Sequence, residues 1–288
     1  MQIALLRIRE CRSSGSTHLD LSYLGLKSLP LLPAQVLTLN IRHNNLDHLP
    51  ELPPALQELY CEWNCLTTLD GPFPSTLKIL FADYNNITHI GNTLPASLQV
   101  LTCYRNGITV LPERLPASLV KLYVSDNSLK SLPSVLPAGL RELFCASNDL
   151  EELPQVLPMS LERLDCYNNN LTFLPALPSS LKELYCFENR LLSLPMEIPA
   201  GLALLYCSQN KYLQIPKIYA IRFHLNETPD HNSFAIYVQR IVKAKRRLRR
   251  LRFMKSLQIH IDEFRFRPGN DGYKELEKLN STYYKKLN

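Results

Sequence analysis

The chain has 288 residues, of which 45% are hydrophobic, and a formal net charge of +6 at pH 7. This length suits one extended domain with caps at its ends, and no stretch of 18 apolar residues is present that would form a membrane-spanning helix. Neither a phosphate-binding loop nor an HExxH motif occurs, which argues against the commonest nucleotide-hydrolysing and zinc-protease classes.

Residues 1–15 predict a short amphipathic helix. Ile3, Leu6 and Ile8 supply its apolar side, and Gly15 follows as a stop signal. Two arginines interrupt the apolar run, so we do not expect a cleaved secretory signal here. We expect the helix to cap the repeat array that follows it.

Residues 16–216 form an array of about ten repeats with a period of 20 or 21 residues. Closely related strings recur, such as "LPAGLRELFCASNDLEELP" and "LPSSLKELYCFENRLLSLP". The earliest unit has Leu24 where the others have asparagine. The asparagines of the other nine units are Asn44, Asn64, Asn85, Asn106, Asn127, Asn148, Asn169, Asn189 and Asn210.

One unit, L-x-x-L-x-C-x-x-N-x-L-x-x-L-P, predicts a short strand, a turn and an extended return segment. Alternation along the strand points its leucines and its cysteine into the core. The asparagine amide can satisfy backbone groups at the turn and form a ladder from unit to unit. Leu-Pro pairs favour extended backbone on the return, because proline fixes φ and restricts the residue before it.

This pattern resembles the short, LPX-type leucine-rich repeats of secreted bacterial effectors, the IpaH and YopM type, over roughly residues 16–216. The resemblance implies a leucine-rich-repeat solenoid (horseshoe) of about ten repeats, with a parallel concave β-sheet, an extended convex side and helical N- and C-terminal caps. It also implies delivery by a specialised bacterial secretion system, type III or type IV, into the host cell cytoplasm. Some members ligate ubiquitin through a C-terminal domain with a cysteine nucleophile. No cysteine follows Cys207 here, so we do not expect that activity.

The cysteines predict packing rather than chemistry. The inward strand position holds Ile41, Ala82 or Val124 in other units, so it requires a small buried hydrophobe. Cys61 and Cys65 form a lone pair without a second Cys or His pair at zinc-site spacing, so we expect neither a metal nor another cofactor. Many unpaired thiols favour a reducing compartment as the place of action. The inward cysteines are Cys61, Cys103, Cys145, Cys166, Cys186 and Cys207.

Residues 217–288 form a basic tail with 17 Lys and Arg against 7 Asp and Glu. Apolar residues at helical spacing predict a helix over about 233–259, with basic residues on its other side. We expect this helix to cap the last repeat. The alternatives are contact with an anionic membrane, with nucleic acid or with an acidic, calmodulin-like partner.

The concave side of the predicted sheet is rich in aromatic and acidic residues. The aromatics either stabilise neighbouring strands or anchor a protein partner, and the acids favour a partner with a basic surface. We expect a monomeric, non-catalytic module that captures and masks, or scaffolds, a host protein or another bacterial effector. The candidate contact residues are Tyr60, Glu62, Trp63, Phe81, Asp83, Tyr84, Tyr104, Arg105, Tyr123, Asp126, Phe144, Asp165, Tyr167, Tyr185 and Phe187.

Overall fold

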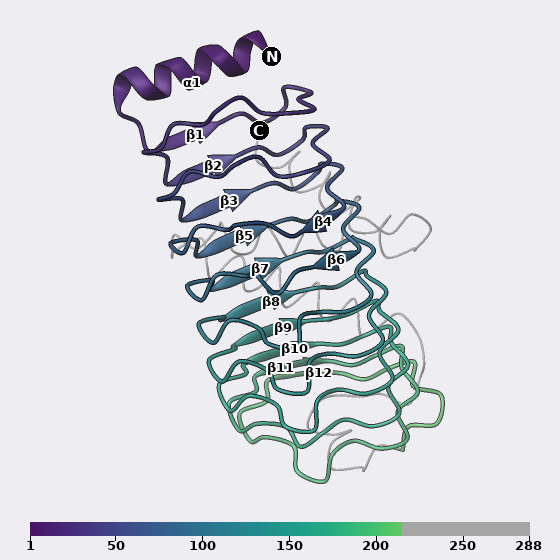
Figure 1. Ribbon diagram of the computed structural model, residues 1–288. Coiled ribbons are helices and arrows are strands. Elements are labelled where there is room, and N and C mark those ends of the chain that lie inside the picture. The colour runs from purple at the N-terminus through teal and green to yellow at the C-terminus, as the bar shows by residue number, and fades with distance from the viewer. Residues whose placement is uncertain (215–288) are drawn as a thin grey trace, which may run out of the picture. The chain divides into compact units, whose positions relative to one another are not determined.

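The computed structural model describes residues 1–214 of the chain (Figure 1). The predictions for the tail, including its helix, its role as a C-terminal cap and its membrane or nucleic-acid contacts, lie outside the described residues. The elements are α1 (Gln2–Ser14), β1 (His18–Asp20), β2 (Thr38–Asn40), β3 (Glu58–Tyr60), β4 (Thr68–Leu69), β5 (Ile79–Phe81), β6 (His89–Ile90), β7 (Val100–Thr102), β8 (Lys121–Tyr123), β9 (Glu142–Phe144), β10 (Arg163–Asp165), β11 (Glu183–Tyr185) and β12 (Leu204–Tyr206).

Ten of the strands form one parallel sheet in the order β1-β2-β3-β5-β7-β8-β9-β10-β11-β12. Equivalent residues of successive repeats lie side by side, as Leu59 and Leu80 do between β3 and β5. Strands β4 and β6 pair separately, in the return segments of their repeats. Figure 1 shows the coils stacked one on the next, and this confirms the predicted leucine-rich-repeat solenoid with a parallel sheet. No helix within residues 1–214 is long and apolar enough to cross a membrane.

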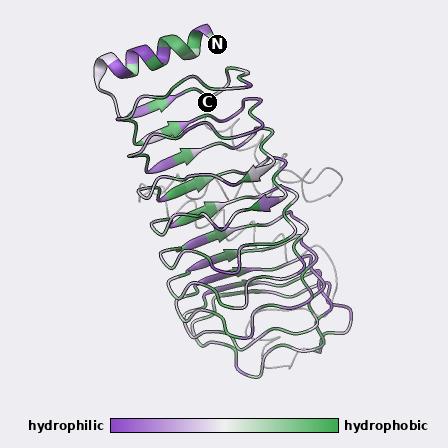
Figure 2. Ribbon diagram, viewed as in Figure 1, coloured by the Kyte–Doolittle hydropathy of each residue, from purple (hydrophilic) through white to green (hydrophobic). Residues whose placement is uncertain are grey.

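The core of each coil consists of the leucines and the small residue that the repeat points inward. Figure 2 shows the hydrophobic residues recurring along the strands of the sheet. Leu184 and Cys186 both have no exposed surface. Burial of one leucine side chain contributes roughly 1.5–3 kcal/mol, and each neighbouring repeat adds its own set. All six inward cysteines are buried and unpaired, and desolvation raises the pKa of their thiols. The prediction that these cysteines pack in the core is confirmed.

The asparagine ladder is also present, in all nine units that carry the residue. Asn64 Nδ2 donates to the carbonyl oxygens of Ile41 at 2.9 Å and Cys61 at 3.1 Å, and Asn64 Oδ1 accepts the N–H of Leu46 at 3.1 Å. One side chain therefore joins its own repeat to the preceding one. Because Asn64 is only 8% exposed, its loss would leave buried backbone groups without partners.

Helix α1 lies beside β1 at the start of the array. It buries Ala4, Ile8 and Cys11, which share one helical face at spacings of four and three residues. Ile3 and Leu6, expected on the buried side, are 56% and 53% exposed because they lie on the other side of the helix. The helix ends at Gly15, whose backbone is left-handed. Its role as a cap stays a prediction.

Candidate protein-binding face

Four positions of each repeat line one face of the ten-stranded sheet. In the third repeat these are Glu58 and Tyr60 in β3, then Glu62 and Trp63 just after it. Because the parallel register aligns equivalent positions, each forms a row across the sheet. We call them the first, second, third and fourth rows, in that order.

The fourth row has left-handed backbone in all ten repeats, with φ between 51° and 61°, and none of its members is glycine. This conformation is uncommon for bulky residues, yet Trp63 and Tyr84 adopt it. Their rings stack at a centroid distance of 3.8 Å. His43 stacks on Trp63 at 5.3 Å and on Tyr23 at 4.2 Å. The result is one continuous column over the first four repeats, which we call the fourth-row stack (Tyr23, His43, Trp63 and Tyr84).

The sequence analysis did not place Tyr23 and His43 in the site, although both stand at the repeat position of Trp63. The alignment of the repeats was a signal that could have found them. Arg105 continues the fourth row, and its guanidinium lies 5.5 Å from the ring centroid of Tyr84, within reach of a cation–π contact.

The remaining aromatics of the face also meet in pairs, mostly within the second and third rows. Tyr60 and Phe81 meet edge to face at 5.2 Å, and Tyr84 meets Tyr104 in the same way at 5.4 Å. The stacked pairs are Tyr123 with Phe144 at 4.4 Å, Tyr167 with Phe187 at 4.4 Å and Tyr185 with Tyr206 at 5.2 Å. Such cross-strand pairs stabilise a sheet by roughly 0.2–1 kcal/mol each.

Tyr123 and Phe144 were expected among the contact residues for a partner, but they are only 7% and 4% exposed. Their rings offer a partner little surface. Trp63, in contrast, is 41% exposed and Tyr23 is 71% exposed. The aromatic area open to a partner is therefore largest in the fourth-row stack.

Four acids of this face, Glu62, Asp126, Glu142 and Glu183, are paired with a base. Two bonds of 2.7 and 2.6 Å join Arg42 to Glu62, and Arg105 Nε lies 3.2 Å from Asp126 Oδ2. The first row alternates in charge through Lys121, Glu142, Arg163 and Glu183, with N–O distances of 3.1, 4.0 and 3.0 Å. The face is therefore less acidic than a count of its carboxylates suggests, because the neighbouring bases neutralise them.

Two carboxyl groups of the face, those of Asp83 and Asp165, combine a raised pKa with the lack of an ion-pair partner among the described residues. Burial raises the pKa of Asp83 to about 7, and the neighbouring Glu62 carboxylate raises it further in the same direction. Burial likewise raises the pKa of Asp165 to about 7. Their nearest stabilising donors are backbone N–H groups, of Tyr104 at 2.7 Å and of Tyr167 at 3.5 Å. Both carboxyls are therefore only partly ionised near neutral pH.

Within residues 1–214 no group of three or more His, Cys, Asp or Glu side chains is placed to hold a metal ion. The exposed thiol of Cys65 lies in the turn after β3. What the face presents is stacked rings, paired charges and two protonatable carboxyls. That combination suits the recognition of another macromolecule.

Comparisons with known proteins agree with this picture. The leucine-rich-repeat family model matches residues 160–181. Over 56 residues the chain is 46% identical to the E3 ubiquitin-protein ligase ipaH9.8 of Shigella flexneri, a match that covers 19% of this chain and 10% of the ligase. Among solved structures, YopM from Yersinia enterocolitica WA-314 is 38% identical with a TM-score of 0.64, over 69% of this chain and 44% of that chain.

The functional domain of InlJ from Listeria monocytogenes, which includes a cysteine ladder, is 26% identical with a TM-score of 0.62, over 69% of this chain and 45% of that chain. The chain thus spans a tenth of the ligase and less than half of either solved relative.

The fold and the repeat pattern define a leucine-rich-repeat solenoid protein, a class that typically serves as a binding scaffold without catalytic activity of its own. Its repeats are of the bacterial kind found in YopM and ipaH9.8, which confirms the family resemblance drawn from the sequence.

Proposed function

We propose that this chain is a non-catalytic protein-binding module of a secreted bacterial effector, which captures and masks, or scaffolds, a host protein or another effector. The observation that supports it most is the fourth-row stack, a continuous column of rings in which Trp63 is 41% exposed and Tyr23 is 71% exposed. Contiguous exposed aromatics of this kind are typical anchors of protein interfaces.

The thiols and the relatives support the proposed place of action. Six buried cysteines remain unpaired in the core, which suits a reducing compartment such as the host cytoplasm. YopM and ipaH9.8 come from pathogenic bacteria, and delivery by a specialised secretion system is part of the proposal. We expect the module to act as a monomer.

The pairing of the acids refines the expected partner. A uniformly basic partner surface would meet carboxylates that Arg42, Arg105 and Arg163 already neutralise. The proposed partner therefore offers apolar groups to the rings, with basic residues at selected points. This arrangement separates affinity, which the rings supply, from register, which the charges set.

The test begins with affinity capture by the purified 288-residue chain from host and bacterial lysates, followed by mass spectrometry. For a captured partner, Trp63→Ala and Tyr104→Ala should each weaken binding by about 2 kcal/mol or more if they lie centrally. Val135→Ala and Val156→Ala serve as controls, because these side chains are 75% and 76% exposed in the return segments. If the valine variants lost binding while the aromatic variants, folded by circular dichroism, kept it, the proposed face would be wrong.

A further inference from the structure

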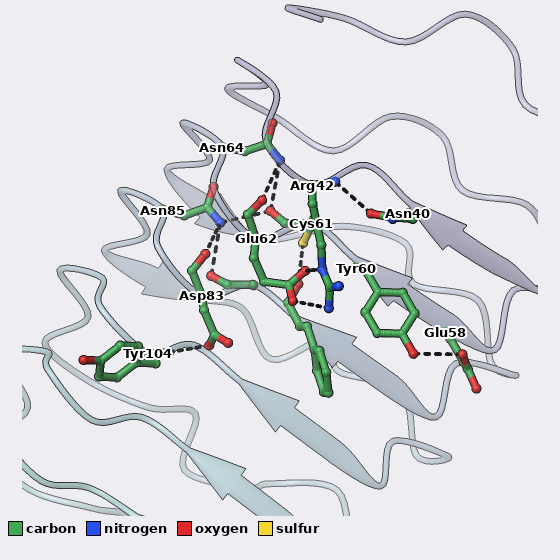
Figure 3. Close-up of polar contacts among 12 residues, drawn as sticks. Asn40, Arg42, Glu58, Tyr60, Cys61, Glu62, Asn64, Asp83, Asn85 and Tyr104 are labelled. Carbon is green, nitrogen blue, oxygen red and sulfur yellow. Dashed lines mark hydrogen bonds and ion pairs between the residues drawn. The ribbon is translucent and has the colours of Figure 1, made fainter. Parts of the chain in front are cut away.

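The third row contains an incomplete charge alternation in repeats two to four. Figure 3 shows the Glu62 carboxylate between Arg42 and Asp83, with the Arg42 guanidinium turned to Glu62. The first row alternates base, acid, base, acid over four repeats. The third row instead runs base, acid, acid, and Asp83 has no base on its other side, where the next member is Tyr104.

Asp83 also has an acceptor that the described residues leave open. Its Oδ1 accepts the N–H of Tyr104 at 2.7 Å, while no N–H of the described residues donates to its other carboxylate oxygen. Beside it, the Thr102 hydroxyl is close enough to lower the pKa of Asp83, yet Thr102 Oγ1 makes no hydrogen bond of normal geometry.

Thr102 is only 4% exposed, so its unbonded hydroxyl is a cost to the free protein. Asp83 is half-buried and remains open to solvent in part. The Thr102 hydroxyl can turn its proton toward Asp83, and the Asp83 carboxylate keeps lone pairs at this point of the face for a further donor that the described part of the chain does not supply.

Aromatic rings flank this point on both sides. Tyr60 and Phe81 stand in the second row, and Trp63 and Tyr84 in the fourth row, of the same two repeats as Glu62 and Asp83. Aromatic rings next to a carboxylate favour a cation with a flat apolar surface, because ring and carboxylate both attract its positive charge. A guanidinium has this shape and carries five donors in a fixed fork, whereas an ammonium is compact and strongly hydrated.

We propose that Asp83 and Thr102 form a socket for one arginine side chain of the partner protein, which completes the alternation Arg42, Glu62, Asp83. The guanidinium donates to the open, partly exposed Asp83 oxygen beside the Trp63 and Tyr84 rings, while the buried Thr102 hydroxyl supports the Asp83 carboxylate from behind. This inference rests on the proposed function, since it names the side chain that the concave face selects.

The chain offers a built-in reporter, because Trp63 is its single tryptophan and lies one strand away from Asp83. We would titrate the full chain at pH 8 with N-acetyl-arginine amide, N-acetyl-citrulline amide and N-acetyl-lysine amide, and follow Trp63 emission. Citrulline keeps the shape of arginine but has no charge. The arginine amide should produce a saturable change in Trp63 emission and should bind at least about tenfold more tightly than either comparator.

Asp83→Asn keeps the size of the side chain and should abolish this preference, and Thr102→Val should weaken it. Asp126→Asn is the matched control, since Asp126 is a carboxylate of the same face that Arg105 already holds. Circular dichroism and a thermal melt establish that each variant is folded. Equal responses to arginine and citrulline, equal responses to arginine and lysine, or full arginine binding by Asp83→Asn would each overturn the socket.

The parent protein also permits a test without any substitution. The groups that face Asp83 are Glu62 and Arg42 on one side and Thr102 and Tyr104 on the other. Ionised Asp83 is the form that holds arginine, so binding should weaken about tenfold between pH 8 and pH 6, and Asp83→Asn should remove that dependence. Arginine binding independent of pH would contradict the assignment of Asp83.

The two proposals fail in different ways. If arginine binds as described but Trp63→Ala and Tyr104→Ala leave the captured partner bound, the socket stands and the proposed protein-binding face falls. If those alanine variants lose the partner while arginine amide shows no preference, the face stands and the socket falls.

Discussion

At the scale of single residues, the repeat determines where a side chain points, and its neighbours determine its chemistry. Glu62 and Asp83 occupy the same position in successive repeats. Arg42 binds the Glu62 carboxylate at 2.7 and 2.6 Å, whereas the Asp83 carboxyl has no basic side chain bound to it among the described residues and a pKa of about 7. The difference arises from the side chains one repeat away.

Asp165→Asn should stabilise the protein at pH 8. The pKa of Asp165 is raised by burial from 3.8 to about 7, so its protonation favours the folded state fully below pH 3.8, and this benefit is lost as the pH rises toward and beyond 7. The free energy of unfolding at pH 8 should increase on the order of 1–3 kcal/mol, measured by urea denaturation. The gain should vanish near pH 4. Asp149→Asn, at an exposed turn position, should change nothing at either pH.

Cys186→Ala should lower the free energy of unfolding by about 1 kcal/mol, because it leaves a small cavity beside Leu184. Cys65→Ala is the control, since that thiol is exposed. Thermal melts of both variants check the expectation. The affinity of both variants for a captured partner should stay within about twofold of the parent's, because distant, independent sites do not affect one another by more than this. A folded Cys186→Ala protein that no longer bound its partner would show that the cysteine serves in binding rather than in packing.

At the scale of elements, a second ladder runs along the segment before each strand. Ser118 Oγ donates toward the carbonyl oxygens of Ala96 at 2.7 Å and Leu98 at 2.6 Å in the preceding repeat. Ser160 does the same two repeats further along, with Ala138 and Leu140. The repeat between them has Gly139, so the ladder is interrupted there.

Gly139→Ser should restore the missing contact. A Cβ at Gly139 would lie 4.0 Å from the carbonyl oxygens of Ala117 and Leu119, the equivalents of the two oxygens that Ser118 reaches. We expect the free energy of unfolding to rise by about 1 kcal/mol, from the hydrogen bond and from the reduced freedom of the unfolded chain. Gly139→Ala separates the two effects in a parallel melt. If serine were no more stabilising than alanine, the ladder would contribute nothing at this position.

Helix α1 can be tested as a cap by two substitutions of the same kind. Ile8 is 4% exposed and lies on the buried face of the helix, whereas Ile3 is 56% exposed. Ile8→Asp should cost roughly 3 kcal/mol or more and broaden the melt, because it places a charge between the helix and the first repeat. Ile3→Asp should leave the melt unchanged. Equal effects from both would show that the helix does not cover the array.

At the scale of the whole molecule, the sequence predicts the solenoid almost completely and the binding face only in part. Each repeat restates the same pattern, so the strands, the inward cysteines and the asparagine ladder could all be derived by comparing the units. The face depends on contacts between repeats, which no single unit contains. The stacking of His43 on Trp63 and the pairing of Arg42 with Glu62 both join side chains about 20 residues apart.

The dependence on contacts between repeats also explains why the sequence did not predict the exposed fractions of the aromatic side chains. Tyr123 and Phe144 occupy the same row as Tyr60, yet they are 7% and 4% exposed while Tyr60 is half-buried. Periodicity assigns the three residues one direction, and only the surroundings of each repeat separate them. The buried face of α1 was misassigned for a related reason, since three apolar residues on a short helix allow more than one inward side.

The left-handed fourth row has a consequence for how such a protein can change its target. Its ten positions hold Tyr, His, Trp, Tyr, Arg, Asp, Ser, Asn, Glu and Gln, all with φ between 51° and 61°. The backbone angle therefore belongs to the coil, since it is the same for aromatic, charged and small side chains. A substitution in this row exchanges the chemical group displayed while its origin and direction stay fixed. Each repeat thus presents its fourth-row side chain from the same backbone geometry, so one set of contacts can be replaced by another without a change in the fold.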